Sequence, residues 1–360
     1  MEYLKLFNNH TEYEQYKDSG MILPNVSHCI QEVEVHYNPY VPPRMDIITY
    51  RATAKLTETT STYSRGLHIN SFSGDSGLLT MTSHTFENGV GTIEFDGDIT
   101  RIGGYAFYYC TSLTSIGIPD SVTSIGNSAF SSCTGLTSID IPSGVTSIGT
   151  QAFQYCSSLT SIDIPSSVTS IGTWVFDGCS SLTSITVDSN NTVYDSRNNC
   201  NAIIETSTNT LIAGCKNTVI PSGVTSIGDN AFKNCTGLTS IDIPSGVTSI
   251  GNNAFSGCYN LTSIDIPDSI TSIGDSAFYY CTSLTSIDIP NSVTTIGNST
   301  FNGCSGLTSI TVNAATPPTL GSIVFDNTNN CPIYVPSQSV ETYKSASGWS
   351  VYATRIQPIA

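Results

Sequence analysis

The chain has 360 residues, of which 39% are hydrophobic and only 11% are charged, against about 25% charged in a typical domain. Its formal net charge is −16 and it has no cluster of Lys and Arg, which argues against binding to nucleic acid or to anionic membrane surfaces. No run of 18 apolar residues occurs, so we predict no transmembrane helix and no membrane insertion.

The amino-terminal part of the chain divides into two segments of different character. Residues 1–45 are polar, include the Tyr- and Pro-rich piece YNPYVPPR, and are expected to be partly ordered at best. The start, MEYLKLFNNHTEYEQY, has acidic residues where a signal peptide has basic ones, so we expect either another route or a replaced or removed export segment. Residues 46–100 alternate like strands, as in DIITYRATAKL and GVGTIEF, and predict a small β-rich cap.

A 23-residue repeat occupies about residues 101–312. Its phenylalanines recur every 23 residues within two blocks, and the step of 56 between the blocks equals one repeat plus an insertion of 33. A fixed period of this size predicts a solenoid, in which each coil is covered only by its neighbours. The marker residues are Phe107, Phe130, Phe153, Phe176, Phe232, Phe255, Phe278 and Phe301, with a looser copy at Phe325.

One coil, residues 121–142, illustrates the expected role of each position. Its LTSIDI segment predicts a short strand, with both isoleucines facing inward and the aspartate facing outward. SVTSIG is a second short extended piece, and NSAFSSC is predicted to form one helical turn with Ala129 and Cys133 on its inner face. Phe130 is expected to fill the wide end of the coil. Strands of adjacent coils should be parallel and about 4.8 Å apart.

The insertion and the carboxyl-terminal tail carry their own signals. The insertion, at about residues 187–219, has NAIIET and TLIAGC on either side of STN, which predicts a β-hairpin that either projects from the rod or lengthens two coils. The tail, residues 313–360, contains VETYKSASGW, which we predict to be a short helix that seals the last coil.

The twelve cysteines invite a redox or metal interpretation, but their spacing favours packing. Adjacent members of the repeated slot lie close enough for a disulfide, yet their parallel side chains give poor bridging geometry, and no C-x-x-C pair is present for zinc. We interpret them as buried free thiols. Cys29, Cys200, Cys215 and Cys331 lie outside the slot, and a Cys200–Cys215 bridge is the alternative left open. The cysteines of the slot are Cys110, Cys133, Cys156, Cys179, Cys235, Cys258, Cys281 and Cys304.

A row of aspartates shares one strand slot. The row consists of Asp140, Asp163, Asp242, Asp265 and Asp288. Neighbouring carboxylates repel by roughly 1 kcal/mol per pair in water, and a calcium ion could relieve this repulsion. The simpler interpretation is a solvated acidic stripe that keeps the sheet soluble. Because no calcium loop of the D-x-[DN]-x-[DN]-G type is present, we predict neither a metal nor a cofactor.

Histidines and tyrosines supply the remaining candidates. All five histidines precede the repeats, so a Ser-His-Asp triad on the rod has no imidazole and an enzyme would need a His/Asp site in the cap. There, His68 and His84 are explained by cap packing. Tyrosines in variable slots beside the Phe are expected outside, where they could act as contact aromatics. They are Tyr108, Tyr109, Tyr155, Tyr279 and Tyr280.

The motif AF..C..L..I.IP..V..IG, at this period, closely resembles the BspA-like leucine-rich repeat family over roughly residues 101–325. The resemblance implies a right-handed solenoid, so the expected fold class is an α+β repeat solenoid with 23-residue coils, short parallel strands and a small N-terminal β cap. It also implies surface attachment or binding of host proteins and matrix, an extracellular or cell-surface location, and no catalysis. The family defines no catalytic or ligand residues to transfer.

Two hypotheses about function follow. The first is a non-enzymatic binding or adhesion protein that presents its acidic, hydroxyl-rich sheet face, with the aspartate row as the contact surface, to a protein or glycan on a host or cell surface. The alternative is a structural spacer or fibre component, of a phage or a cell surface, with binding at the insertion or the amino-terminal segment. No oligomeric state is predicted.

Overall fold

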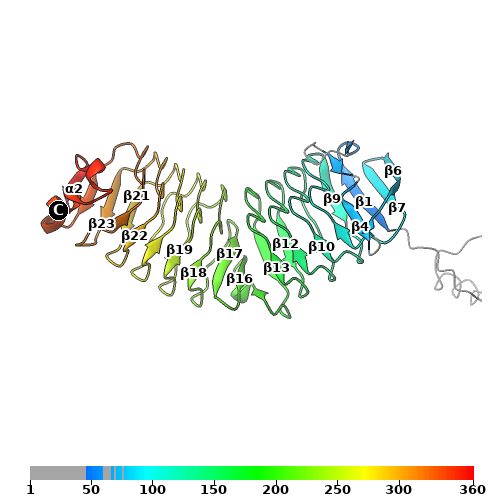
Figure 1. Ribbon diagram of the computed structural model, residues 1–360, viewed down its shortest axis with the longest axis horizontal. Coiled ribbons are helices and arrows are strands. Elements are labelled where there is room, and N and C mark those ends of the chain that lie inside the picture. The colour runs from blue at the N-terminus through cyan, green and yellow to red at the C-terminus, as the bar shows by residue number, and fades with distance from the viewer. Residues whose placement is uncertain (1–45, 60–65, 69, 75–76) are drawn as a thin grey trace, which may run out of the picture. The chain divides into compact units, whose positions relative to one another are not determined.

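The computed structural model describes residues 46–59, 66–68, 70–74 and 77–360. The expectation of partial order in residues 1–45, and the position of Cys29, lie outside the described residues. The 23-residue repeats form a solenoid in which successive coils follow one another in chain order (Figure 1).

Strands on the amino-terminal side of the repeats pack onto the first coils. β1 (Ile47–Ala52) lies between β7 (Val90–Phe95) and β9 (Leu113–Gly117), with β6 (Met81–Glu87) beyond β7, and all three pairings are antiparallel. Every second residue of β1 is buried, as expected for a strand with one face on the core. The shorter strands here are β2 (Glu58–Thr59), β3 (Leu67–His68), β4 (Phe72–Gly74) and β5 (Gly77–Leu78).

The SVTSIG segments build the most regular wall of the solenoid, which we call the Ser-Ile wall. Each coil contributes a two-residue parallel strand whose Ile is turned inward. The threonine before each strand donates its hydroxyl to a carbonyl of the preceding coil, as from Thr146 to Thr123 at 3.2 Å, which explains why Thr recurs there. The strands are β8 (Arg101–Ile102), β10 (Ser124–Ile125), β11 (Ser147–Ile148), β13 (Ser170–Ile171), β18 (Ser226–Ile227), β19 (Ser249–Ile250), β20 (Ser272–Ile273), β22 (Thr295–Ile296) and β24 (Thr319–Leu320).

The LTSIDI segments form a second wall, which we call the Asp wall. Their alternation of buried Ile and exposed Asp is as predicted, but regular strand pairing is confined to some coils. Elsewhere only an isolated parallel bridge between Asp242 and Asp265 remains. A proline ends each segment and removes one donor, which keeps these strands short. The strands are β12 (Ser161–Ile164), β14 (Ser184–Val187), β21 (Ser286–Ile289) and β23 (Ser309–Val312).

The third wall, which we call the turn wall, contains the AF..C segments, and here the expected helical turn is wrong. The residues two before and two after each Phe have left-handed backbone, as do Ser128 and Ser132 around Phe130 with φ of 54° and 61°. The N–H groups of these three residues donate to carbonyls of the next coil at 2.9, 2.8 and 2.7 Å. We call such a set of three hydrogen bonds a rung. A helix would direct these donors along its own axis and could not form rungs.

Helix is scarce in the described part of the chain. It comprises α2 (Val340–Ser345) and three short 3-10 turns, η1 (Arg197–Asn199), η2 (Ser337–Ser339) and η3 (Ser350–Tyr352). The α component of the expected fold class is therefore small, and the fold is a β-solenoid with short, mostly parallel strands.

The phenylalanines form two stacks inside the solenoid. Within each stack the ring centroids of adjacent coils lie 5.1 to 5.9 Å apart, as in the pairs Phe107–Phe130 and Phe153–Phe176. Seven of the eight marker phenylalanines are at most 1% exposed, and Phe176, at the end of its stack, is 8% exposed. The predicted inward placement is confirmed.

The cysteine ladder runs beside these rings. All eleven cysteines in the described residues are free and buried, as predicted, so the alternative of a Cys200–Cys215 bridge is wrong. The ladder thiols also act as hydrogen-bond donors: Cys133 Sγ lies 3.0 Å from the carbonyl oxygen of Phe107. Burial raises the pKa of Cys133 and of Cys258 well above the usual range.

We expect iodoacetamide at pH 8 to leave Cys133 and Cys258 unmodified in the native protein and to alkylate both in urea, because only the exposed thiolate reacts. Peptide mapping by mass spectrometry measures the labelling of each cysteine. A peptide pair linked through Cys200 and Cys215, or rapid native labelling of the ladder, would contradict the observed burial.

The insertion forms the predicted hairpin, which lies within the stack of coils. β16 (Ala202–Glu205) and β17 (Thr210–Gly214) are antiparallel, and β17 pairs in parallel with β18. β15 (Tyr194–Asp195) flanks β16, and Arg197 holds its end through an ion pair with Asp195 at 2.6 Å. The hairpin therefore occupies the place of part of a coil and does not project.

The tail closes the last coil. α2 forms where a helix was predicted, and β25 (Ile333–Val335) and β26 (Ile356–Pro358) continue the Asp wall. Trp349 is 0% exposed, and its Nε1 donates to the carbonyl of Pro318 at 2.8 Å. The sealing role predicted for this segment is confirmed.

Candidate binding site

The predicted aspartate row lies on the Asp wall, and all five side chains are exposed. Asp163 accepts a hydrogen bond from Thr186, and Asp288 accepts one from Asn313 at 2.5 Å. The insertion separates the first two aspartates from the last three. Across the described ranges, no group of three or more His, Cys, Asp or Glu residues is arranged to hold a metal ion.

The histidines of the cap form a buried network. His84 Nδ1 lies 2.6 Å from Glu58 Oε1, and its Nε2 lies 2.8 Å from the hydroxyl of Tyr50. The side chain of His84 and the residue Tyr50 are each 2% exposed, and burial raises the pKa of Tyr50. His68 is buried as well, at 3% exposure. A substrate could not reach this network, which instead ties β6 to β1 and the segment carrying Glu58.

A different feature emerges where the insertion interrupts the turn wall. The N–H groups of Trp174, Phe176 and Gly178 occupy the donor positions of a rung, yet no acceptor for them is present in the described part of the chain. The preceding rung is intact, as shown by the hydrogen bond from Tyr155 N to Asp177 O at 2.7 Å. The solenoid therefore has an open donor edge at this coil.

The opposite coil has an open acceptor edge. In a complete rung, the carbonyls of Asp229, Ala231 and Lys233 would receive the three donors. Only Ala231 does so, from Gly214 N of the hairpin at 2.8 Å, and no donor from the described residues reaches the other two carbonyls. The hairpin thus supplies one of three hydrogen bonds and no AF..C turn. We call this gap, between residues 173–178 and 229–234, the seam.

The ends of the repeat array do not share this defect. At the first coil, the carbonyls of Ala106 and Tyr108 accept from His68 N and Gly66 N, both at 2.8 Å. At the last coil, the hydroxyl of Tyr352 accepts the N–H of Phe325 at 3.2 Å. Both caps therefore provide hydrogen-bonding partners that are missing at the seam.

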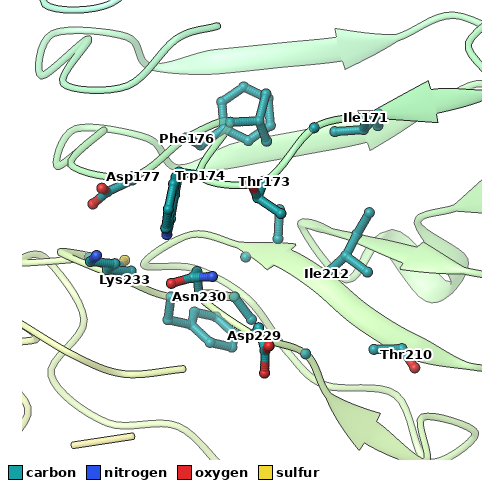
Figure 2. A pocket seen from close by; sticks show the side chains of 18 of the residues that line it. Ile171, Thr173, Trp174, Phe176, Asp177, Thr210, Ile212, Asp229, Asn230 and Lys233 are labelled. Atoms are coloured by element: carbon teal, nitrogen blue, oxygen red, sulfur yellow. The ribbon is translucent and has the colours of Figure 1, made fainter. Parts of the chain in front are cut away.

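The seam encloses a cavity of about 360 Å³, within the range of small ligand sites. Figure 2 shows Trp174 and Asp177 on one wall, with Lys233 and Asn230 on the other. Lys233 Nζ lies 5.4 Å from the centroid of the Trp174 ring, and Asn234 Nδ2 donates to Asp177 Oδ1 at 2.6 Å. These two side-chain contacts span the seam. The Oδ1 atom of Asn230 is buried and has no hydrogen-bond partner within the described residues.

Exposed aromatic side chains cluster on the turn wall near the seam. Tyr155, Tyr259, Tyr279 and Tyr280 are 36 to 44% exposed, and Trp174 is 37% exposed. Burial, followed by the nearby Asp177 and Tyr259, raises the pKa of Tyr155, so these groups lie close together. The prediction that the variable tyrosines lie outside is confirmed for Tyr155, Tyr279 and Tyr280, whereas Tyr108 and Tyr109 are half-buried.

The sequence analysis missed the seam, although a signal for it was present. The step of 56 residues contains no AF..C word, so the insertion lacks the turn segment that every other coil supplies. Trp174 was missed because it lies two residues before Phe176, in a slot filled by Ser or Asn in most coils.

Comparisons with known proteins agree with this architecture. A model of the BspA type leucine rich repeat region, in 6 copies, matches residues 80–204 and 212–332. No match was found among curated proteins. Among the described residues, no helix has the length and hydropathy needed to cross a bilayer.

Several solved structures are similar to the chain. The pneumococcal vaccine antigen PcpA has 20% identity and a TM-score of 0.57, over 73% of this chain and 70% of that one. A leucine rich cell surface protein from Faecalibacterium prausnitzii has 32% identity and a TM-score of 0.47, over 66% and 76%. A leucine-rich repeat protein from Eubacterium ventriosum has 24% identity and a TM-score of 0.49, over 81% and 78%. Because the family model matches more than half of its length, the chain belongs to the BspA-type leucine-rich repeat family.

Proposed function

We propose that this chain is a non-enzymatic binding protein of a cell surface, which contacts a protein or glycan partner through the aromatic side chains of its turn wall. The observation that carries this proposal is the group of five exposed aromatics on one wall of an otherwise repetitive rod. Tyr and Trp provide large contact areas with few rotatable bonds, and they are enriched at the energetic centres of interfaces. Surface exposure is part of the proposal because the family resemblance implies it.

Backbone conformation adds support for this choice of surface. Tyr155, Trp174 and Tyr280 adopt left-handed backbone with φ of 57° to 58°. For a residue other than Gly, this region costs about 1 kcal/mol or more, and other coils place Gly or Asn in the same slots. Gly178 and Asn234 are examples. Aromatic residues held at this cost are better explained by binding than by folding.

The aspartate row is the competing surface, and one experiment separates the two. The wild type, a Tyr259→Ala/Tyr279→Ala/Tyr280→Ala variant and a variant with all five row aspartates changed to Asn are applied to arrays of glycans and extracellular matrix proteins. We expect the aromatic variant to lose at least tenfold in affinity, because three contact aromatics are removed. The Asn variant should stay within about threefold, because exposed charges contribute little.

The result has a clear reading in each direction. Affinity lost only in the Asn variant would move the binding surface to the Asp wall and overturn the proposal. Wild-type protein that binds nothing on any array, and forms filaments or trimers, would instead favour the spacer alternative. Unfolding curves in urea serve as the control for folding of both variants, since all eight substituted side chains are exposed.

A further inference from the structure

The rungs of this solenoid are a form of strand pairing. In each rung, N–H groups at alternate residues of one coil donate to carbonyls at alternate residues of the next, as from Phe255 to Ala277 at 2.7 Å. Alternate spacing is the pattern by which one extended chain binds another. Every coil in the described array is held on the turn wall in this way, except at the seam.

The seam presents the two outer edges of such a ladder without its middle chain. Three donors face it from Trp174, Phe176 and Gly178, and two carbonyls face it from Asp229 and Lys233. Open edges of this kind are templates for pairing with another chain. The caps show that the fold closes its other open edges with dedicated residues, so the open seam is a specific feature of this chain.

The space between the edges fits an extended segment. The cavity of about 360 Å³ is bounded by main chain on both sides and by β17 at its base. Gly214 approaches Phe232 so closely that an added Cβ would lie 2.1 Å from the ring, so the hairpin backbone stays low at this point. The unpartnered Oδ1 of Asn230 adds one buried acceptor to the cavity.

We propose that the seam binds an extended peptide of about six residues through its main chain, by completing the missing rung. Three peptide carbonyls accept from Trp174, Phe176 and Gly178, and two peptide N–H groups donate to the carbonyls of Asp229 and Lys233. This is recognition by strand addition. The site goes beyond the proposed use of the turn-wall tyrosines, because it depends on backbone groups.

The charges at the seam select among peptides. Asp177, Glu205 and Asp229 line the cavity with three carboxylates, against the single ammonium of Lys233. A neutral or basic peptide is therefore favoured over an acidic one. The Lys233–Trp174 and Asn234–Asp177 contacts span the opening, so both change when the peptide enters.

The test uses a probe taken from the chain itself. The peptide GNNAFSG, residues 251–257, forms a turn segment elsewhere in the solenoid and contains no cysteine. Capped at both ends, it is titrated into the full chain by calorimetry, and hydrogen exchange of residues 173–178 is followed by mass spectrometry. We expect saturable binding together with slower exchange in that segment, because its free N–H groups become hydrogen-bonded.

A modified peptide isolates the main-chain contribution. N-methylation at the residues equivalent to Asn253 and Gly257 removes the two donors to Asp229 and Lys233 and leaves every side chain in place. We expect binding to weaken at least tenfold, whereas a scrambled peptide of the same composition stays within about fivefold. Equal binding of the N-methylated and unmodified peptides would overturn the proposal, and so would the absence of binding at millimolar peptide.

Two protein variants complete the test. Deletion of residues 188–220 joins Val187 to Pro221, restores the 23-residue step and closes the rung, so peptide binding should be lost in a folded protein. Ile212→Phe is the second variant, because it narrows the cavity without altering any main-chain group, and it should weaken binding at least tenfold. Wild-type affinity in both variants would refute the seam as the site. The Tyr259→Ala/Tyr279→Ala/Tyr280→Ala variant should bind the peptide normally, which separates this test from that of the proposed function.

Discussion

Replacing Phe255 by Ala should lower the free energy of unfolding by about 3–5 kcal/mol, the usual loss for a buried aromatic. Phe255 is 0% exposed, and its ring stacks between those of Phe232 and Phe278 at 5.1 and 5.3 Å. Each coil is covered only by its neighbours, so the cavity weakens two interfaces at once. Equilibrium unfolding in urea, followed by circular dichroism, measures the change.

The matched control is Tyr259→Ala, four residues further along the same coil. Tyr259 is 44% exposed, so its removal should change the stability by no more than about 0.5 kcal/mol. If Phe255→Ala proved as mild as Tyr259→Ala, the phenylalanine stack could not be the core of the solenoid.

The second large effect is expected at alkaline pH. Burial raises the pKa of the ladder thiols above the usual 9.0, to about 12 for Cys110 and Cys235. A folded-state pKa above the unfolded value means that this stability is complete below pH 9 and is lost as the pH rises from 9 through the folded-state values. Each raised thiol removes about 1.4 kcal/mol per pH unit in this window.

Because the ladder repeats this effect along the chain, the combined loss by pH 10 to 11 is comparable with the whole stability of a typical domain. We expect cooperative unfolding in that range in the presence of a reductant, measured by circular dichroism. In Cys258→Ala, stability should fall more slowly between pH 9 and 10, by about 1.4 kcal/mol per unit. A slope unchanged from the wild type would show that Cys258 ionises as easily in the folded state as in the unfolded one.

The core of this solenoid was predictable because its information is local and repeated. A 23-residue step that returns Phe130 as Phe153, and Cys133 as Cys156, specifies inward rows whatever the exact path of the backbone. The hairpin of the insertion and the helix at Val340–Ser345 were predictable for a related reason, since short turn and helix signals determine them.

The turn wall was harder to predict because its signal is divided among coils. Asn or Gly occupies the left-handed slots in some copies, such as Asn230, Asn253 and Gly303. Ser, Tyr or Trp fills them in others, and NSAFSSC taken alone satisfies the rules for a helical turn. The rungs also depend on contacts between coils, which no single coil's sequence encodes.

The seam could not be derived from sequence for a third reason. A step of 56 residues shows that a turn segment is missing, but the number of donors left open depends on register in three dimensions. Gly214 donates to Ala231 and leaves Asp229 and Lys233 without partners only because β17 pairs with β18 in one particular alignment.

The hairpin also divides the hydrophobic interior. Ile203 and Ala213 belong to the cluster on the amino-terminal side, whereas Ile204 and Leu211 belong to the cluster on the carboxyl-terminal side. Under tension between the two ends of the chain, the turn wall would part first at the position with the fewest cross-links. The two halves would then separate and recoil as independent springs, so that a stretched molecule could lengthen without unravelling either one.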